Sequence, residues 1–346
     1  MYSFSNDYSE GAHERILNAL VQTNREQTPG YGLDPYCELA RTRIAARLNH
    51  PGSAVHFLVG GTQVNATVIA AALKPYQGVV SAVSGHINVH ESGAIEATGH
   101  KVLPLPSADG KVSADTVDAL AQSHFDDATA EHAVQPGMLY ISNPTEIGTI
   151  YSKTELASLY EVCHRHGMRL YVDGARLGCA LTSQNNDLAL PDLAQFTDAF
   201  TIGGTKMGAL FGEALVINDP ALNVDFRYHI KQRGGMFAKG RLLGIQFAAL
   251  FEDDLYFTLA QHANDQAERL REGIRALGYS FLTESPTNQI FPILPKSILA
   301  ELDKSFIYSF WQPYDETHSV VRFCTSWATD PAQVDALLKT LRSLPK

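Results

Sequence analysis

Lys206 lies directly after a stretch that is predicted to be a buried strand, where a charged side chain is unfavourable. In the stretch AFTIGGTKMGAL, Lys206 follows the apolar run 199–202 and the glycines at 203 and 204, with no acidic residue beside it. Burying an unpaired ammonium group costs several kcal/mol. One interpretation is a loop lysine that extends its charge to solvent. The other is a lysine used as a neutral amine, which forms a Schiff base with a carbonyl compound.

A second stretch, YVDGAR, places Asp173 at the end of an apolar run and Arg176 three residues later. A structural Asp–Arg pair or a helix N-cap explains both residues. In the functional interpretation, Asp173 faces a protonated pyridine nitrogen and Arg176 binds a substrate carboxylate through two hydrogen bonds. Lys206 comes 33 positions after Asp173 (206 − 173), about one helix and one strand further on. That spacing lets two neighbouring strand ends point at one pocket.

Two further stretches fit the same chemistry. In GGTQVNA, Gly60 and Gly61 permit a tight turn into a helix, and its free N–H groups, with the Thr62 hydroxyl, can hold a phosphate. In SGHINVHE, His86 follows a turn of small residues, where its ring can stack on a flat cofactor. Glycine-to-helix turns and lone histidines are common, so each stretch also fits an ordinary structural role.

Composition and charge are those of a globular protein. The chain has 346 residues, of which 45% are hydrophobic and 18% charged, enough for one large or two ordinary domains. A net charge of −10 without a lysine/arginine run disfavours nucleic-acid binding, and no apolar run approaches the roughly 20 residues that span a bilayer. The chain start lacks a secretory pattern, and the four scattered cysteines lack metal-binding spacing. We therefore expect a cytoplasmic protein without a metal, nucleic-acid or membrane partner.

Helical patterns alternate with short apolar runs from about residue 38 to 217. The helical patterns are ELARTRIAARL, TQVNATVIAAALKPY and TELASLYEVCHRHG, and the apolar runs are AVHFLVGG, GVVSAVS, GMLYISNPT, RLYVDGAR, AFTIGGT and EALVIND. This alternation predicts an α/β domain with a mainly parallel sheet, which binds ligands beyond the carboxyl ends of its strands.

The pattern changes after about residue 235. Residues 240–277 read as one or two long helices, YSFLT, QIFPIL and SVVRFCTSW read as strands, and DPAQVDALLKTLRSL reads as a terminal helix capped by Asp330 and Pro331. We therefore expect a large α/β domain over 1–235 and a smaller α+β domain over 236–346.

Taken in order, the stretches GGTQVN, SGHINVHESGA, YVDGAR and TIGGTKMGA resemble the motifs of a known family. It is the pyridoxal-phosphate-dependent threonine aldolase and aromatic amino acid β-eliminating lyase family. The resemblance runs from SNDYSEGAHERIL to VVRFCTSWATDPAQVDALL and so covers essentially the whole chain. It implies the aspartate-aminotransferase-like type I fold, and the order and spacing of DGAR and TK are its most specific part.

The resemblance implies roles around pyridoxal 5'-phosphate. Lys206 would form the Schiff base with the cofactor, Asp173 would keep its pyridine nitrogen protonated, and His86 would stack on its ring. Asn143, in YISNPTEIG, would lie near the cofactor, with Glu146 less securely placed. The cofactor phosphate would be held by a separate set of residues, Gly61, Thr62 and Thr205.

The resemblance also implies how an amino-acid substrate is bound. Arg176 and Arg322, the latter in VVRFCTS, would bind the substrate carboxylate. The family's N-terminal arginine-serine-aspartate is here 5–7, SND, so the serine's contact would pass to Asn6. Tyr31, in PGYGLDPY, resembles a loop that crosses to a neighbouring subunit, although an ordinary surface turn explains it equally well. The implied assembly is a homodimer or homotetramer with active sites at the interface.

Two departures from the family pattern concern the substrate and the neighbouring subunit. The tract after the lysine is MGALFGEAL, where the family has threonines or serines. The stretch FRYHIKQRGGMFAKGR only loosely matches the segment that reaches a neighbour's phosphate, with Lys231 and Arg233 as weak candidates. These departures leave the choice of substrate open.

The implied activity is cleavage of the Cα–Cβ bond of a β-hydroxy-α-amino acid, of the threonine or allo-threonine type, to glycine and an aldehyde. His86, His90 or a bound water would deprotonate the β-hydroxyl. β-Elimination or transamination of an aromatic or sulfur amino acid is the alternative within the same cofactor chemistry. The non-enzymatic alternative is an α/β binding protein in which Lys206 is a structural loop residue.

Overall fold

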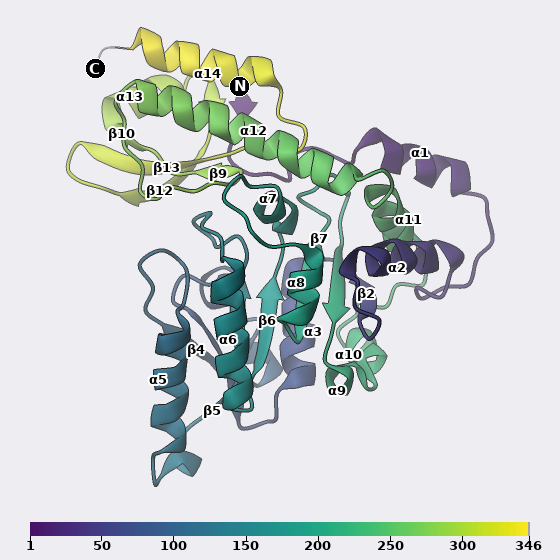
Figure 1. The fold of residues 1–346 in the computed structure, drawn as a ribbon. Helices are drawn as coiled ribbons and strands as arrows, with labels where there is room; N and C mark the ends of the chain where they lie inside the picture. The colour runs from purple at the N-terminus through teal and green to yellow at the C-terminus, as the bar shows by residue number, and fades with distance from the viewer. Residues whose placement is uncertain (345–346) are drawn as a thin grey trace.

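A seven-stranded sheet forms the centre of the computed structural model, which describes residues 1–344 (Figure 1). Its strands lie in the order β2-β8-β7-β6-β5-β3-β4, and only β8 runs against the others. Their bounds are Ala54–Leu58 (β2), Gln77–Ala82 (β3), Val102–Leu105 (β4), Gln135–Ser142 (β5), Arg169–Asp173 (β6), Ala199–Gly203 (β7) and Glu213–Ile217 (β8). The predicted mainly parallel α/β sheet is confirmed.

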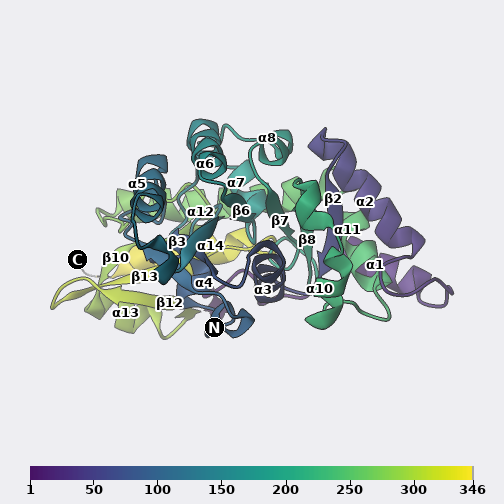
Figure 2. The same ribbon diagram turned by 90° about the horizontal axis from the view of Figure 1, so that it is seen from below.

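Helices cover both faces of this sheet (Figure 2). One face carries α2 (Pro35–Leu48), α5 (Ala114–Phe125), α6 (Lys153–Arg165) and α8 (Leu190–Gln195), and the other carries α3 (Gly61–Ala72), α4 (His86–Val89) and α10 (Phe226–Gln232). Successive strand residues alternate between the faces: Val172 and Phe200 are buried in one apolar core, and Tyr171 and Ala199 in the other. Both faces are apolar because both are covered.

Local sequence signals set several helix starts. α6 begins with a capping box, in which the Ser152 side chain accepts from Glu155 N at 3.2 Å and the Glu155 side chain accepts from Ser152 N at 2.8 Å. The predicted cap of the terminal helix is confirmed. The Asp330 side chain accepts from Ala332 N at 2.9 Å and α14 runs from Pro331 to Ser343.

A second, smaller sheet lies beyond the first and is covered by α12 (Leu255–Ala276), α13 (Lys296–Leu302) and α14 (Figure 1). Its path is β10-β13-β12, with β9 also paired to β13. The bounds are Gln289–Ile290 (β9), Ile293–Pro295 (β10), Ser309–Pro313 (β12) and His318–Cys324 (β13). The predicted strand over YSFLT is wrong, because this stretch forms only an isolated bridge between Phe281 and Pro292.

The two cores share chain segments from both ends of the sequence. Strand β1 (Tyr2–Ser3) pairs with β11 (Phe306–Ile307), and Phe4 is buried in the smaller core. Conversely, α11 (Arg241–Leu250) packs against α2, and its apolar residues belong to the core of the large sheet. The domain division at residue 235 stays a prediction. No helix within residues 1–344 has the length and apolar character needed to cross a membrane.

Gly244 marks a close approach between α11 and α2, and it generates a stability prediction. A Cβ at this position would lie 2.4 Å from the backbone N and 2.6 Å from the Cα of Cys37. Backbone atoms cannot rotate away, so we expect Gly244→Ala to lower the free energy of unfolding by about 1–3 kcal/mol. This loss would outweigh the higher helix propensity of alanine.

Gly273→Ala on α12 is the matched control for this experiment. A Cβ there would meet only the side chain of Leu338, 2.4 Å from its Cδ2, and a side chain can change rotamer. Urea unfolding followed by circular dichroism measures both variants. Equal stability of the two variants would contradict the close approach of α11 and α2.

Candidate active site

The backbones at the ends of β6 and β7 are in direct contact. This junction determines where the side chains of Asp173 and Lys206 lie. Gly203 N donates to the Gly174 carbonyl at 3.0 Å, and Gly174 N donates to the Thr201 hydroxyl at 2.7 Å. A Cβ on Gly174 would lie 2.0 Å from the Thr201 carbonyl oxygen, so no side chain fits there. Asp173 and Lys206, which flank this junction, therefore face one cavity.

The cavity has a volume of about 370 Å³ and lies at the carboxyl ends of the parallel strands. It brings together most of the residues singled out from the sequence: Gly61, Thr62, His86, Glu146, Asp173, Arg176, Thr205 and Lys206. Its wall also includes Tyr8, Phe211 and Glu213, which the sequence analysis did not single out.

Lys206 is a partly buried base and Glu213 a buried acid, and the pKa of each is shifted in the direction that favours its neutral form. Burial lowers the pKa of the Lys206 amine, and the nearby Arg176 guanidinium lowers it further. Glu213, which is 4% exposed at the start of β8, has its pKa raised by burial to about 8, against the opposing charge of Lys206. Within residues 1–344, Lys206 forms no ion pair and Glu213 Oε2 has no hydrogen-bond partner. A neutral amine is the form that attacks a carbonyl.

Three donors hold the Asp173 carboxylate. Its Oδ1 accepts from Ala175 N at 2.9 Å, and its Oδ2 accepts from the Tyr140 hydroxyl at 2.7 Å and from Asn65 Nδ2 at 3.0 Å. The residue is 6% exposed. The carboxylate is therefore fixed in direction before any ligand reaches it.

His86 stands at the start of α4 with its ring on the cavity wall. Its backbone N donates to Glu146 Oε1 at 2.8 Å, and its Nδ1 lies 2.7 Å from Glu91 Oε1. The carboxylate orients the ring and leaves Nε2 free. The His90 ring centroid lies 5.5 Å from that of His86. His90 is largely exposed, and its partial burial, with the charges of His86 and Arg322, lowers its pKa.

Arg176 forms the Asp–Arg pair that its sequence context allowed, but with Asp7 rather than Asp173. Its Nε and Nη2 donate to the two Asp7 oxygens at 2.6 and 3.0 Å. Burial opposes ionisation of Asp7, yet the charges of Arg176 and Lys206 hold its pKa at about 2. Asn288 Nδ2 donates to the same carboxylate at 2.8 Å. The pair ties the N-terminal segment to the end of β6.

The structure places Asn143 and Asn6 beside the cavity wall rather than in it. Asn143 is 2% exposed, and its side-chain oxygen accepts from Tyr151 N at 3.2 Å. Asn6 accepts from Tyr8 N and from the Ser9 hydroxyl, both at 3.0 Å, which orders the turn that carries Tyr8 to the cavity.

Arg322, on β13, also lies outside the cavity wall. Its Nη2 donates to the Ser5 carbonyl at 2.8 Å and its Nη1 donates to Gln289 Oε1 at 3.1 Å. Its charge lies 5.8 Å from the ring centroid of Trp311. In the described part of the chain, no carboxylate pairs with Arg322, and its buried Nε has no acceptor.

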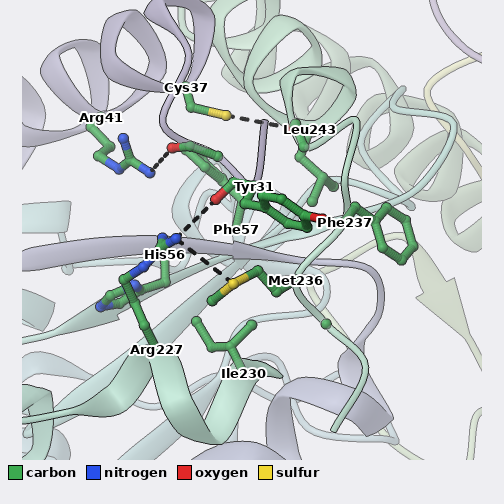
Figure 3. Close-up of a pocket in the computed structure, with 13 residues that line it drawn as sticks. Tyr31, Cys37, Arg41, His56, Phe57, Arg227, Ile230, Met236, Phe237 and Leu243 are labelled. Atoms are coloured by element: carbon green, nitrogen blue, oxygen red, sulfur yellow. Dashed lines mark hydrogen bonds between the residues drawn. The ribbon is translucent and has the colours of Figure 1, made fainter. Parts of the chain in front are cut away.

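Tyr31 lies in a different pocket, shown in Figure 3. It has a left-handed backbone with φ of 59°, and its carbonyl accepts from Arg227 Nη2 at 3.1 Å. Figure 3 shows Arg227 reaching both this carbonyl and Met236. Lys231 Nζ lies 5.1 Å from the Tyr31 ring centroid, and Tyr31 is 46% exposed. The loop is held firmly and remains open to solvent.

The sequence analysis missed the acids and amides that surround the predicted residues. Glu213 opens the apolar run EALVI, where a charged residue is unusual. Asn65 interrupts the apolar face of TQVNATVIAAA and is 1% exposed. A buried polar residue in an apolar run was the available signal in both cases.

The cavity fits pyridoxal 5'-phosphate. Among the described residues, no side chain caps α3 at Gly60, so the first N–H groups of this helix stay available to a phosphate. A Cβ on Gly60 or Gly61 would meet nothing within 4 Å, which leaves room for the ligand. An amine shifted toward neutrality, a fixed carboxylate and an imidazole ring complete the set of groups that the cofactor requires.

Comparison with known proteins shows the family and the fold of the chain. The beta-eliminating lyase family model matches residues 10–296. A solved structure of Leishmania major threonine aldolase is 44% identical, with a TM-score of 0.96 over 99% of both chains. The low specificity L-threonine aldolase of Pseudomonas aeruginosa is 28% identical over 98% of this chain and 96% of its own. Aspartate aminotransferase from Thermus thermophilus, 13% identical with a TM-score of 0.69 over 99% of this chain and 92% of its own, shares the fold.

These likenesses identify the chain in two steps. The fold is that of the type I pyridoxal-phosphate enzymes, as the resemblance to the threonine aldolase and β-eliminating lyase family implied. The chain belongs to the beta-eliminating lyase family, and within it the chain is similar to threonine aldolases.

The raised pKa of Glu213 generates a pH prediction for the cofactor-free protein. A carboxyl group with a raised pKa in the folded state contributes stability that is complete below pH 4.5 and is lost as the pH rises through about 8. Gln cannot ionise, so Glu213→Gln should become more stable relative to wild type between about pH 5 and about pH 9. The lowered pKa of Lys206 makes stability rise with pH, opposite to the effect of Glu213, and this contribution is present in both proteins.

Thermal unfolding across this pH range measures the difference. A change of about 1 kcal/mol corresponds to about 1–2 °C in a chain of this size. The exposed Glu284→Gln is the control and should show no such trend. A pH-independent difference between Glu213→Gln and wild type would contradict the buried, protonated state of Glu213.

Proposed function

We propose that the protein is a pyridoxal-phosphate-dependent lyase that cleaves the Cα–Cβ bond of a β-hydroxy-α-amino acid of the threonine or allo-threonine type. The products are glycine and an aldehyde. The observation that carries this proposal is the meeting of Lys206 and Asp173 at two neighbouring strand ends in one cavity. Membership of the beta-eliminating lyase family and the likeness to threonine aldolases support the reaction type.

When bound, pyridoxal phosphate supplies an electron-withdrawing ring that accepts the electron pair released at the substrate Cα. Lys206 would hold the cofactor through its neutral amine and could afterwards carry a proton. Asp173, held by its three donors, keeps the pyridine nitrogen protonated. His86 would stack on the ring, and Asn143 is assigned a place near the cofactor. Gly61, Thr62 and Thr205 would hold the phosphate.

The substrate carboxylate is assigned to Arg322 and Arg176, with Asn6 nearby. Arg322 is the stronger candidate because it lacks a carboxylate partner among the described residues and has a buried Nε without an acceptor. Arg176 already binds Asp7 through Nε and Nη2, so its Nη1 is the group left for a substrate. A planar guanidinium binds a carboxylate through two parallel hydrogen bonds.

His86 is assigned as the base that takes the β-hydroxyl proton. Glu91 orients its Nδ1, which leaves Nε2 on the cavity side as the acceptor. Loss of that proton breaks the Cα–Cβ bond and releases the aldehyde, and a proton returned to Cα gives glycine. His90, which is exposed, and a bound water remain alternatives. β-Elimination would use the same residues but would release no glycine.

The proposal includes a homo-oligomer in a reducing, cytoplasmic compartment, with an amino acid as the substrate. Tyr31 does not line the active-site cavity of its own subunit. It lies on a firmly held, exposed loop, which suits a residue that contributes to the active site of a neighbouring subunit. All four cysteines are buried and unpaired in disulfides, which supports a reducing compartment.

Replacement of Lys206 tests the function directly. Lys206→Ala should retain the fold, because the amine forms no ion pair within residues 1–344, but it should lose glycine and aldehyde release from L-threonine and L-allo-threonine. Borohydride treatment followed by peptide mass spectrometry should find the cofactor on Lys206 in wild type only. The exposed Lys304→Ala is the control. Substantial cleavage by folded Lys206→Ala protein would exclude the assignment.

Subunit mixing tests the shared active site. Tyr31→Ala and Lys206→Ala should each be impaired alone. After the two variants are unfolded together and refolded, mixed dimers should contain one complete site, and activity should recover to roughly a quarter of wild type. Light scattering measures the assembly. A fully active monomer, or no recovery in mixed dimers that scattering confirms, would contradict the role of Tyr31.

A further inference from the structure

Asn65 joins two carboxylates that serve two different sides of the cavity. It lies on α3, is 1% exposed, and donates from its single amide nitrogen to Glu91 Oε1 at 2.7 Å and to Asp173 Oδ2 at 3.0 Å. Its oxygen accepts from the Tyr171 hydroxyl at 2.7 Å. Asn65 itself is not on the cavity wall.

The chemistry of the three partners fixes the orientation of this amide. Two carboxylates accept hydrogen bonds, so the NH₂ group must face them, and the hydroxyl of Tyr171 must donate to the oxygen. Both amide hydrogens are used. An aspartate would add a third acid, and an apolar residue would leave each of the two buried carboxylates one donor short, at a substantial free-energy cost.

Glu91 depends on this amide more than Asp173 does. The Glu91 side chain is fully buried, and its Oε2 has no hydrogen-bond partner in the described part of the chain. Its Oε1 is shared by Asn65 Nδ2 and His86 Nδ1, the latter at 2.7 Å. Without Asn65, Glu91 would have only His86 as a donor. The carboxylate could then rotate, and the imidazole ring bonded to it would rotate with it.

We propose that Asn65 is a positioning residue that couples Asp173, which faces the cofactor nitrogen, to the Glu91–His86 pair, which sets the stacked ring. This inference rests on the proposed function. One amide thereby fixes the position of Asp173, which would set the protonation of the cofactor ring, relative to that of His86, which would stack on it. Because the network is buried, losing one donor is costly for the carboxylates that remain.

Asn65→Leu tests the coupling, because leucine matches the size of asparagine but has no donor. We expect kcat for L-threonine to fall on the order of tenfold, and the absorbance spectrum of bound pyridoxal phosphate to shift. Thr67→Val on the same helix is the matched control. It removes another buried hydrogen bond, 2.6 Å from the hydroxyl to the Gln63 carbonyl, away from the network. Even if its Tm falls as much as that of Asn65→Leu, Thr67→Val should change neither kcat for L-threonine nor the absorbance spectrum of the bound cofactor.

A double-mutant cycle shows whether the effect passes through His86. The dissociation constant for pyridoxal phosphate is measured by titrating cofactor-free wild type, Asn65→Leu, His86→Phe and the double variant. The effect of Asn65→Leu should shrink at least about threefold when His86 is already Phe. Should Asn65→Leu fail to fold, Asn65→Ser, which keeps one donor where two are needed, carries the same expectations.

The outcomes separate this inference from the function on which it rests. If wild type binds the cofactor and cleaves threonine, but Asn65→Leu matches Thr67→Val or its effect is equal in both His86 backgrounds, the coupling is wrong and the function stands. If wild type neither binds the cofactor nor cleaves threonine, the proposed function fails as well, and the inference fails with it.

Discussion

The close approach of the β6 and β7 ends is the constraint on which the site depends. Gly174 would place a Cβ 2.0 Å from the Thr201 carbonyl oxygen, and Gly203 would place one 2.3 Å from the Ala175 carbonyl oxygen. Because both positions lack a side chain, the loops that follow the strands pack backbone against backbone. Asp173 and Lys206 consequently face the same cavity, where burial makes an unpaired charge costly.

Burial then sorts the ionisable groups of the site into two kinds. Asp7 and Arg176 are buried together with two hydrogen bonds between them, and they stay charged because each satisfies the other. Glu213 is also buried and Lys206 is partly buried, but no ion pair joins them within residues 1–344, so burial raises the pKa of the carboxyl group and lowers that of the amine. The paired charges provide structure, and the unpaired groups remain available for proton transfer.

The sequence predicted the large sheet and its ligand edge because both depend on local order. Alternating apolar runs and helical patterns identify strands that follow one another, and glycines mark where those strands end. Contacts between distant positions were not accessible in this way. Arg176 pairs with Asp7 across 169 positions, and Asn65 bonds Asp173 across 108. Strands of two residues, such as β1 and β11, are too short to show periodicity.

The N-terminal segment links the two cores at the cavity through a few successive residues. Phe4 is buried in the smaller core, the Ser5 carbonyl accepts from Arg322, and Asp7 binds Arg176 at the end of β6. The two arginines assigned to the substrate carboxylate are thus held by neighbouring residues of one extended strap, although they come from different sheets. Any displacement of one sheet relative to the other must either stretch this strap or break a buried, charge-assisted hydrogen bond. The strap therefore constrains the distance between the two arginines, as the glycine junction constrains that between Asp173 and Lys206.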